Sequence, residues 1–342
     1  MRAMILAAGF GTRLWPLTID RTKPAIPFMG RPLIGYVAEY LARYGFDDIV
    51  VNLHHQPESV RAALGDGSDY GARFHYVEEP VILGTSGAIG NARPLLDDGD
   101  AFVVINGKLA TDIDLREALE THRRTRALAT LVLRPNPARE RYSTVEVSGG
   151  LVTGFGGYPP SDNAGGDPGA GAAQAGGDAP LMFTGIQVLD PRVFEYIPPG
   201  VFSHSVTDVY VPAIARGDRV AAHVSRGSWY ELSTVRRYLE TSVALMKGEG
   251  RDVELGRGAE VADGADVTES VLWEGVRVAA GARVRRSVLG AGVSVGPGEV
   301  FEGVAVVRAE LVREELARGV EPPPKGLKGE FRGPNFVAPI PE

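Results

Sequence analysis

Between residues 255 and 301 apolar residues recur six positions apart, and this spacing constrains the fold more than any other feature. A β-helix needs one inward apolar residue on each side of a triangular coil and small residues at its tight corners. Gly, Ala and Ser crowd the positions in between, and successive triplets are offset by 17 residues, close to three six-residue sides. The repeat therefore predicts about three coils. The expected inward residues are Leu255, Val261, Val267, Leu272, Val278, Val284, Leu289, Val295 and Phe301.

The chain before residue 248 alternates short apolar runs with amphipathic segments. Strands alternating with helices of this length predict βαβ units and a mostly parallel, Rossmann-like α/β sheet covered on both faces. The expected strands are 3–6, 49–53, 74–77, 102–105, 129–133 and 220–224. The expected helices are 34–44, 58–64, 88–95, 115–124, 208–216 and 235–247, and a folded pattern also resumes at 182.

Two stretches lack such patterning. Gly, Ala, Asp and Pro dominate residues 156–180, which buries too little apolar surface to order itself and predicts a flexible insertion. After one helical stretch at 310–318, the tail is Pro-rich and weakly patterned.

Composition excludes several classes of function. The 43 acidic residues outnumber the 36 basic ones, which argues against a nucleic-acid-binding surface. With no cysteine, disulfides, thiolate catalysis and Cys-based zinc sites are excluded. The apolar N-terminus breaks at once into Gly9, Gly11 and Arg13, so it predicts a buried strand rather than a signal peptide. No run approaches the length of a membrane helix, and we expect a cytoplasmic protein.

Chemistry concentrates in residues 6–24, LAAGFGTRLWPLTIDRTKP. A strand leads directly into Gly9 and Gly11, whose backbone N–H groups can approach phosphate oxygens closely. Arg13 offers a planar fork for phosphates and Lys23 a compact charge. The spacing fits neither a Walker A loop nor a dinucleotide fingerprint.

This string resembles the signature of the sugar-1-phosphate nucleotidyltransferases, which include the mannose-1-phosphate guanylyltransferases and glucose-1-phosphate thymidylyltransferases. The resemblance continues at LGTSGA (83–88), VING (104–107), FTGI (183–186) and WYELST (229–234), and the β-helix matches one branch of the family. It implies a nucleotidyltransferase-like domain at 1–248, interrupted at 156–180, a left-handed β-helix at 249–308 and a C-terminal helix and tail at 309–342.

The resemblance implies that a sugar-1-phosphate oxygen attacks the α-phosphate of an NTP, that pyrophosphate leaves, and that Mg²⁺ takes part. Arg13 would hold the β- and γ-phosphates, Lys23 the α-phosphate region, and Gly84 and Thr85 the base. The remaining implied nucleotide-binding residues are Leu6, Ala7, Ala8, Gly9, Gly11, Thr12, Asn106 and Gly107. The implied sugar-binding residues are Tyr142, Thr184, Gly185 and Trp229, although Trp229 also suits a core position.

The sequence departs from the family pattern where the metal would bind. Lys108 and Glu231 stand where the family has metal-binding aspartates, and a Glu-Lys-Pro segment expected after Phe155 is absent. An ammonium about 4 Å from a divalent cation would repel it by roughly 8 kcal/mol at an effective dielectric of 20. Lys108 could replace the cation or turn away in favour of Asp112 or Asp114, which otherwise read as an N-cap pair.

The favoured function is synthesis of an NDP-sugar, of the GDP-mannose type, from an NTP and a hexose 1-phosphate. The alternative is a catalytically impaired NDP-sugar-binding homologue that regulates an active relative. Because open β-helix edges commonly need covering, we also expect a homo-oligomer or a pairing with such a relative.

Overall fold

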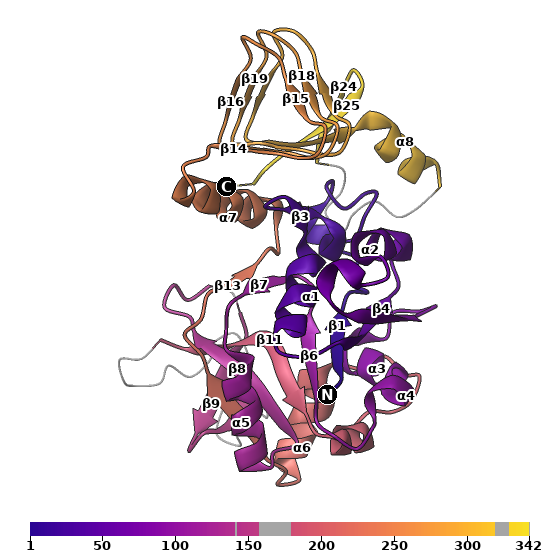
Figure 1. The fold of residues 1–342 in the computed structure, drawn as a ribbon, viewed down its shortest axis with the longest axis vertical. Helices are drawn as coiled ribbons and strands as arrows, with labels where there is room; N and C mark the ends of the chain where they lie inside the picture. The colour runs from indigo at the N-terminus through magenta and orange to yellow at the C-terminus, as the bar shows by residue number, and fades with distance from the viewer. Residues whose placement is uncertain (141, 157–178, 319–327, 342) are drawn as a thin grey trace, which may run out of the picture. The chain divides into compact units, whose positions relative to one another are not determined.

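The structure is a computed structural model that describes residues 1–140, 142–156, 179–318 and 328–341. Most of the predicted flexible insertion therefore lies outside the described residues. The chain divides into two compact units (Figure 1). The sheet unit comprises Met1–Ala8, Tyr36–His54 and Leu64–Trp229, and the coil unit comprises Gly9–Gly35, His55–Ala63 and Tyr230–Glu342.

The described part of the sheet unit is built on a nine-stranded sheet. Its strands in spatial order are β5 (Arg73–Glu78), β4 (Asp48–Leu53), β1 (Ala3–Leu6), β6 (Phe102–Asn106), β11 (Leu181–Leu189), β8 (Ala129–Pro135), β12 (Val220–Val224), β10 (Leu151–Phe155) and β9 (Thr144–Ser148). The first four are parallel, as predicted, and helical segments connect them in the chain. β11, in contrast, runs antiparallel to both of its neighbours.

Helices and short turns complete the sheet unit. They are α1 (Leu33–Arg43, which begins in the coil unit), η3 (Ser68–Tyr70), α3 (Gly84–Asn91), α4 (Arg93–Leu96), α5 (Leu115–Thr125), η4 (Pro191–Tyr196), the π-helical η5 (Ser205–Tyr210) and α6 (Val211–Ala215). The short strand β7 (Leu109–Thr111) lies outside the nine-stranded sheet. The single helix predicted at 88–95 is wrong. Two helices meet at Ala92, because Pro94 has no N–H to continue the first.

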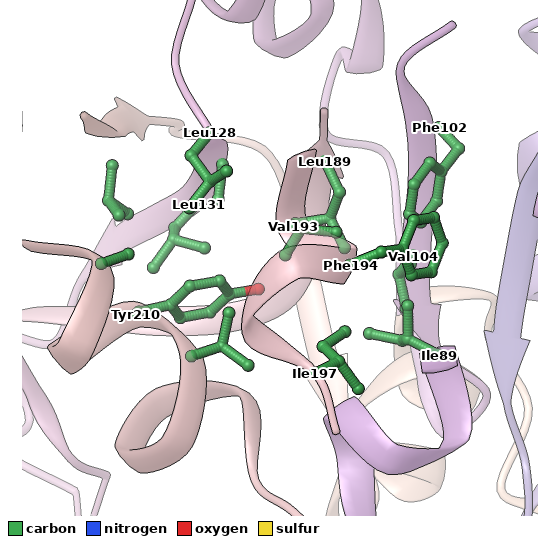
Figure 2. Close-up of a cluster of buried hydrophobic side chains, with 14 of the residues drawn as sticks. Ile89, Phe102, Val104, Leu128, Leu131, Leu189, Val193, Phe194, Ile197 and Tyr210 are labelled. Atoms are coloured by element: carbon green, nitrogen blue, oxygen red, sulfur yellow. The ribbon is translucent and has the colours of Figure 1, made fainter. Parts of the chain in front are cut away.

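One core cluster of the sheet unit lies between the sheet and the segments α3, α4, η4, η5 and α6 (Figure 2). Phe102 of β6 and Phe194 of η4 stack with ring centroids 5.5 Å apart. Tyr210 enters the same cluster, and its hydroxyl donates to Gln187 Oε1 at 2.5 Å. That bond satisfies the polar end of a ring that is otherwise surrounded by apolar side chains.

In the coil unit the 17-residue repeat folds as predicted into parallel strands that form three sheets, the arrangement of a β-helix. Leu255, Leu272, Leu289 and Val306 stand in register on successive strands of one sheet. The sheets contain β14 (Val253–Leu255), β17 (Ser270–Leu272), β20 (Val288–Leu289) and β23 (Val304–Arg308); β15 (Glu260–Val261), β18 (Arg277–Val278) and β21 (Ser294–Val295); and β16 (Asp266–Thr268), β19 (Arg283–Arg285) and β22 (Val300–Glu302). The left-handed sense stays a prediction.

Not every predicted inward residue is buried. Leu272, Val278 and Phe301 are buried, but Leu255 is 50% exposed and Val261 is 37% exposed. These two residues belong to the first coil, which has a following coil beside it but no preceding one. The expectation of full burial therefore fails at the start of the stack.

The tail differs most from the expectation. After α8 (Ala309–Ala317), β24 (Glu330–Arg332) and β25 (Asn335–Pro339) form an antiparallel hairpin. β25 pairs antiparallel with β23, so that Val307 faces Phe336, and it covers the edge of the last coil. The C-terminal hairpin thus ends one of the three sheets that the repeat alone would leave open.

The other elements of the coil unit are η1 (Thr12–Leu14), η2 (Lys23–Ala25), β2 (Pro27–Phe28), β3 (Arg31–Pro32), α2 (Pro57–Leu64, which ends in the sheet unit), β13 (Trp229–Glu231, which begins there) and α7 (Val235–Gly248). Among the described residues, no helix has the length and apolar character needed to cross a bilayer.

Candidate functional site

The first part of the site lies at the carboxyl ends of β1 and β6, where an open α/β sheet binds its ligands. Leu6 and Asn106 stand side by side in register, and the N–H of Gly107 donates to the carbonyl of Leu6 at 2.9 Å. The N–H of Ala7 donates to Asn52 Oδ1 at 2.8 Å. The predicted residues Leu6, Ala7, Asn106 and Gly107 therefore share one edge of the sheet unit.

A buried carboxylate supports this edge from the two neighbouring strands. Glu79, 3% exposed, accepts hydrogen bonds from Asn52 Nδ2 at 2.7 Å and from the N–H of Leu83 at 2.9 Å. Its backbone carbonyl lies 2.7 Å from His54 Nδ1. Because Asn52 also holds Ala7, Glu79 links the end of β1 to the segment that begins α3.

That segment contains the predicted base-contacting residues. Gly84 has φ +74°, and a Cβ there would lie 2.5 Å from the carbonyl oxygen of Ser203, so only glycine fits. The hydroxyl of Thr85 accepts a hydrogen bond from the N–H of Ser205 at 2.8 Å. These contacts join the start of α3 to residues 203–205 and fix its position; a contact of either residue with a base stays a prediction.

The predicted sugar-binding residues gather around Trp229. Its indole Nε1 donates to the carbonyl of Thr184 at 3.0 Å, and the ring of Tyr142 meets it edge-on at 5.6 Å. Arg134, which the sequence did not single out, lies 5.8 Å over the Trp229 ring and donates to its carbonyl at 3.3 Å. The Thr184 hydroxyl is buried and donates to the carbonyl of Val132, so its hydrogen is engaged in a bond within the sheet.

Gly185 connects this cluster to the sheet edge. It has φ +81°, and a Cβ there would lie 2.1 Å from Asn106 Nδ2. The Asn106 side chain therefore lies directly against the Gly185 backbone. Through this contact the structure brings together residues that the sequence assigned separately to the nucleotide and to the sugar.

The acidic side chains near the position predicted for the metal have other partners. Lys108 is half-buried in the turn between β6 and β7. Both carboxylate oxygens of Asp112 accept from Ser228, the backbone N–H at 2.6 Å and the hydroxyl at 3.0 Å. Asp114 caps α5 by accepting from the N–H of Arg116 at 2.9 Å. The predicted N-cap is confirmed for Asp114, whereas it is wrong for Asp112, which holds the loop before β13.

In the coil unit, the loop that carries Arg13 is closed by short backbone hydrogen bonds. The carbonyl of Gly11 accepts from the N–H of Leu14 at 2.8 Å and from the Thr18 hydroxyl at 3.3 Å. Gly11 has φ +66°, and a Cβ there would lie 3.1 Å from Lys23 Cβ. The loop therefore packs closely against Lys23, which is only 7% exposed, and leaves Arg13 exposed.

Three further predicted residues of this unit complete the set. Gly9 has no neighbouring atom within 4 Å of an added Cβ, Thr12 is exposed on η1, and Glu231 is buried on β13. Ala8 ends the sheet unit just before Gly9. A cavity of about 650 Å³ in the coil unit is lined by none of the predicted site residues; its walls include Arg21, Phe28, Glu254 and Trp273.

Comparison with known proteins identifies the family. Residues 2–248 match the family described as nucleotidyl transferase. The chain belongs to this family.

Curated nucleotidyl transferases similar to the chain act on sugar 1-phosphates, by their names. An N-acetylmuramate alpha-1-phosphate uridylyltransferase of Neisseria meningitidis is 33% identical over 70% of this chain and 96% of its own length. A mannose-1-phosphate guanylyltransferase of Mycobacterium tuberculosis is 29% identical over 80% of both chains. A UTP–glucose-1-phosphate uridylyltransferase of Synechocystis is 29% identical over 77% of this chain and 68% of its own. These relatives support an enzyme of the sugar-1-phosphate nucleotidyltransferase type.

A solved structure supports the fold. HddC from Yersinia pseudotuberculosis matches with a TM-score of 0.57 and 21% identity, covering 71% of this chain and 99% of its own.

The nucleotidyl transferase resemblance implies Mg²⁺, but Lys108, at one of the two implied positions, does not fit a divalent cation. The other position keeps a carboxylate, the buried Glu231. Of the two aspartates that could replace the missing ligand, Asp112 accepts hydrogen bonds from Ser228 with both oxygens, and Asp114 forms an ion pair with Arg116 at 3.1 Å. In the part of the chain that the structure describes, no group of three or more His, Cys, Asp or Glu side chains could hold a metal ion.

Sequence reasoning missed Asn52, Glu79 and Arg134. Asn52 lies near the end of β4, Glu79 follows β5, and Arg134 lies near the end of β8. A polar residue at the carboxyl end of an apolar strand was the available signal.

Proposed function

We propose that the chain transfers a nucleoside 5′-phosphate group from an NTP to a hexose 1-phosphate. An oxygen of the sugar phosphate forms a bond to the α-phosphorus, the bond between that phosphorus and the α,β-bridging oxygen breaks, and pyrophosphate leaves. Guanylyl transfer to mannose 1-phosphate is favoured, because one relative over four fifths of the chain is a mannose-1-phosphate guanylyltransferase. Uridylyltransferases match the chain at similar identity, so uridylyl transfer is the competing outcome of the test.

The observation that carries the proposal is the contact of Gly185 with Asn106. It joins the edge at the end of β1 and β6 to the cluster of Tyr142, Trp229 and Arg134. A ligand with a phosphate at one end and a sugar at the other suits such a pair of neighbouring regions. Half-buried aromatic rings beside an arginine are a common way to hold a polar ring with an anionic group.

In this proposal the chain's own cations stabilise the phosphates. Phosphoryl transfer needs positioning and charge neutralisation more than covalent chemistry from the protein. Arg13 and Lys23 would contact the triphosphate, and Lys108, beside the end of β6, would supply positive charge to the bound nucleotide. Gly84 and Thr85 would meet the base. No metal ion takes part in this proposal, because Lys108 stands at one of its two implied positions.

The experiment is pyrophosphate release with GTP, UTP, dTTP, ATP and CTP, each combined with mannose, glucose and N-acetylmuramate 1-phosphates. Lys108→Asp is assayed in parallel. Turnover by the native chain supports the proposal and identifies the substrate pair. If the native chain releases no pyrophosphate but Lys108→Asp does, the chain would instead be the regulatory binding protein. If neither releases pyrophosphate, nucleotidyl transfer with these substrates is contradicted.

A cytoplasmic location, where NTPs are made, fits this activity. A homo-oligomer formed through the remaining coil edges stays a prediction, which light scattering tests.

A further inference from the structure

The aromatic ring that ends the Arg13 loop is held by the far end of the chain. Trp15 follows η1, and its N–H closes that turn on the carbonyl of Thr12 at 3.3 Å. Its ring meets Phe336 of β25 edge-on, with ring centroids 5.4 Å apart. Its indole Nε1 donates to Glu315 Oε2 of α8 at 3.4 Å. One side chain of the loop thus contacts both α8 and β25.

Phe336 is itself rigidly placed. It is fully buried, stands opposite Val307 in the last coil, and packs edge-on against Phe331 at 5.1 Å. A Cβ on Gly329 would lie 2.5 Å from Phe336 Cζ, so the backbone of Gly329 packs closely against the ring. The next residue back, Asn335, donates from Nδ2 to the carbonyl of Ser294 at 2.8 Å, which ties β25 to the third coil.

We propose that Trp15 is a positioning residue: through it, Phe336 and Glu315 hold the loop in the conformation that presents Arg13 to the nucleotide. The inference rests on the proposed function and adds to it that residues beyond the coils set nucleotide affinity. Arg13 lies on η1, and Trp15 caps the end of that turn with a hydrogen bond to Thr12, so a displacement of Trp15 would act on the turn that carries Arg13. An edge-to-face aromatic pair adds specific geometry beyond its buried area.

The main test compares two buried phenylalanines of the coil unit. Phe336→Leu removes the edge-on contact with Trp15, whereas Phe301→Leu removes a ring of the coil core and serves as the matched control. Nucleotide dissociation constants are measured by calorimetry across the same NTPs. We expect about three- to tenfold weaker binding for Phe336→Leu than for Phe301→Leu. Equal affinities in the two variants would overturn the inference.

Hydrogen exchange gives a readout that does not need nucleotide. The N–H groups of Leu14 and Trp15 are hydrogen-bonded within the loop and should exchange faster in Phe336→Leu but not in Phe301→Leu. If the native chain binds no NTP, the proposed function fails, and this exchange difference alone decides the inference. Unchanged exchange in residues 11–15 would then refute it.

A second pair of variants covers the case in which Phe336→Leu does not fold. Glu315→Lys removes the acceptor for the Trp15 indole, and Glu314→Lys makes the same charge change at the preceding, exposed position of α8. The first should weaken nucleotide binding and speed exchange in the loop more than the second, and Glu315→Gln, which keeps an acceptor oxygen, should restore both. No difference between the two lysine variants would count against the inference.

Discussion

Asn52 Nδ2 donates to Glu79 Oε1 at 2.7 Å, and this pair joins two neighbouring strand ends to the start of the signature string. The side-chain oxygen of Asn52 accepts from the N–H of Ala7, and the other oxygen of Glu79 accepts from the N–H of Leu83. The phosphate-side edge and the segment at 83–85 are therefore held by one buried chain of hydrogen bonds.

Removing the carboxylate should disturb both of these segments. Glu79→Ala leaves the Asn52 amide and the Leu83 N–H without their acceptor, which costs roughly 1–3 kcal/mol for each buried donor. We expect the free energy of unfolding to fall by about 2–6 kcal/mol and nucleotide binding to weaken. Urea unfolding and calorimetry measure the two effects. Glu120→Ala, on the exposed face of α5, is the control, and an equal loss in both variants would contradict the role of Glu79.

The contact between Gly185 and Asn106 makes a steric prediction. In Gly185→Ala the new Cβ would lie 2.1 Å from Asn106 Nδ2, in addition to the strain of φ +81°. Gly200→Ala carries similar strain at φ +68° but meets nothing within 4 Å. We expect Gly200→Ala to lower the free energy of unfolding by about 1–2 kcal/mol and Gly185→Ala by at least about 2 kcal/mol more. Comparable unfolding midpoints in denaturant would show that Asn106 moves aside freely.

Stability should depend on pH through His122. Burial lowers the pKa of His122 below its ordinary value, and its ring Nδ1 lies 2.9 Å from the Thr130 hydroxyl. The unfolded chain therefore binds a proton at His122 more readily than the folded chain does. The stability that comes from keeping His122 neutral is fully present above about pH 6.5 and is lost as pH falls through the lower pKa of the folded state.

Urea unfolding between pH 7.5 and 5 measures this loss. Burial also lowers the pKa of His223, so His122→Gln should lessen the decline without abolishing it. An identical decline in the variant would exclude His122 as a source.

The dependence of nucleotide binding on Mg²⁺ should be determined by the residue at position 108. If Lys108 supplies charge to the nucleotide, chelation by EDTA should change the dissociation constant of the native chain by less than about threefold. Lys108→Asp replaces a cation with a carboxylate, and its nucleotide affinity should depend on Mg²⁺ by more than about tenfold. Lys247→Asp, a charge change at the end of α7, is the control. Strong dependence on Mg²⁺ in the native chain would refute this function for Lys108.

Patterns of apolar residues predicted elements in which one face is buried and the other is exposed. The coil repeat was visible because Leu272, Val278 and Val284 each face a shared interior. β25 gave no such signal, since Asn335 to Ala338 are buried at four successive positions and alternation is lost when both faces are covered. The antiparallel β11 was also hidden, because its pairing with β6 and β8 depends on contacts distant in sequence.

For the site, the motif predicted which residues gather but not how each is used. Gly185 and Asn106 lie together, yet no local rule could say that the Thr184 hydroxyl is taken by Val132. Asp112 and Asp114 both precede a helix in the sequence, so either could cap it. Asp112 accepts from Ser228 instead, a contact that only the tertiary fold creates. Arg134 was missed because its partner Trp229 is 95 residues away in the chain.

The antiparallel hairpin that ends the stack also makes the number of coils matter. A repeat of 17 residues is easily duplicated or deleted, and each coil adds or removes one strand spacing of about 4.8 Å. Trp15 and Phe336 meet with ring centroids only 5.4 Å apart, so a gain or loss of one coil would separate them. The number of coils therefore sets the position of Phe336 relative to Trp15. A homologue with a different number of coils must anchor the corresponding loop through other contacts.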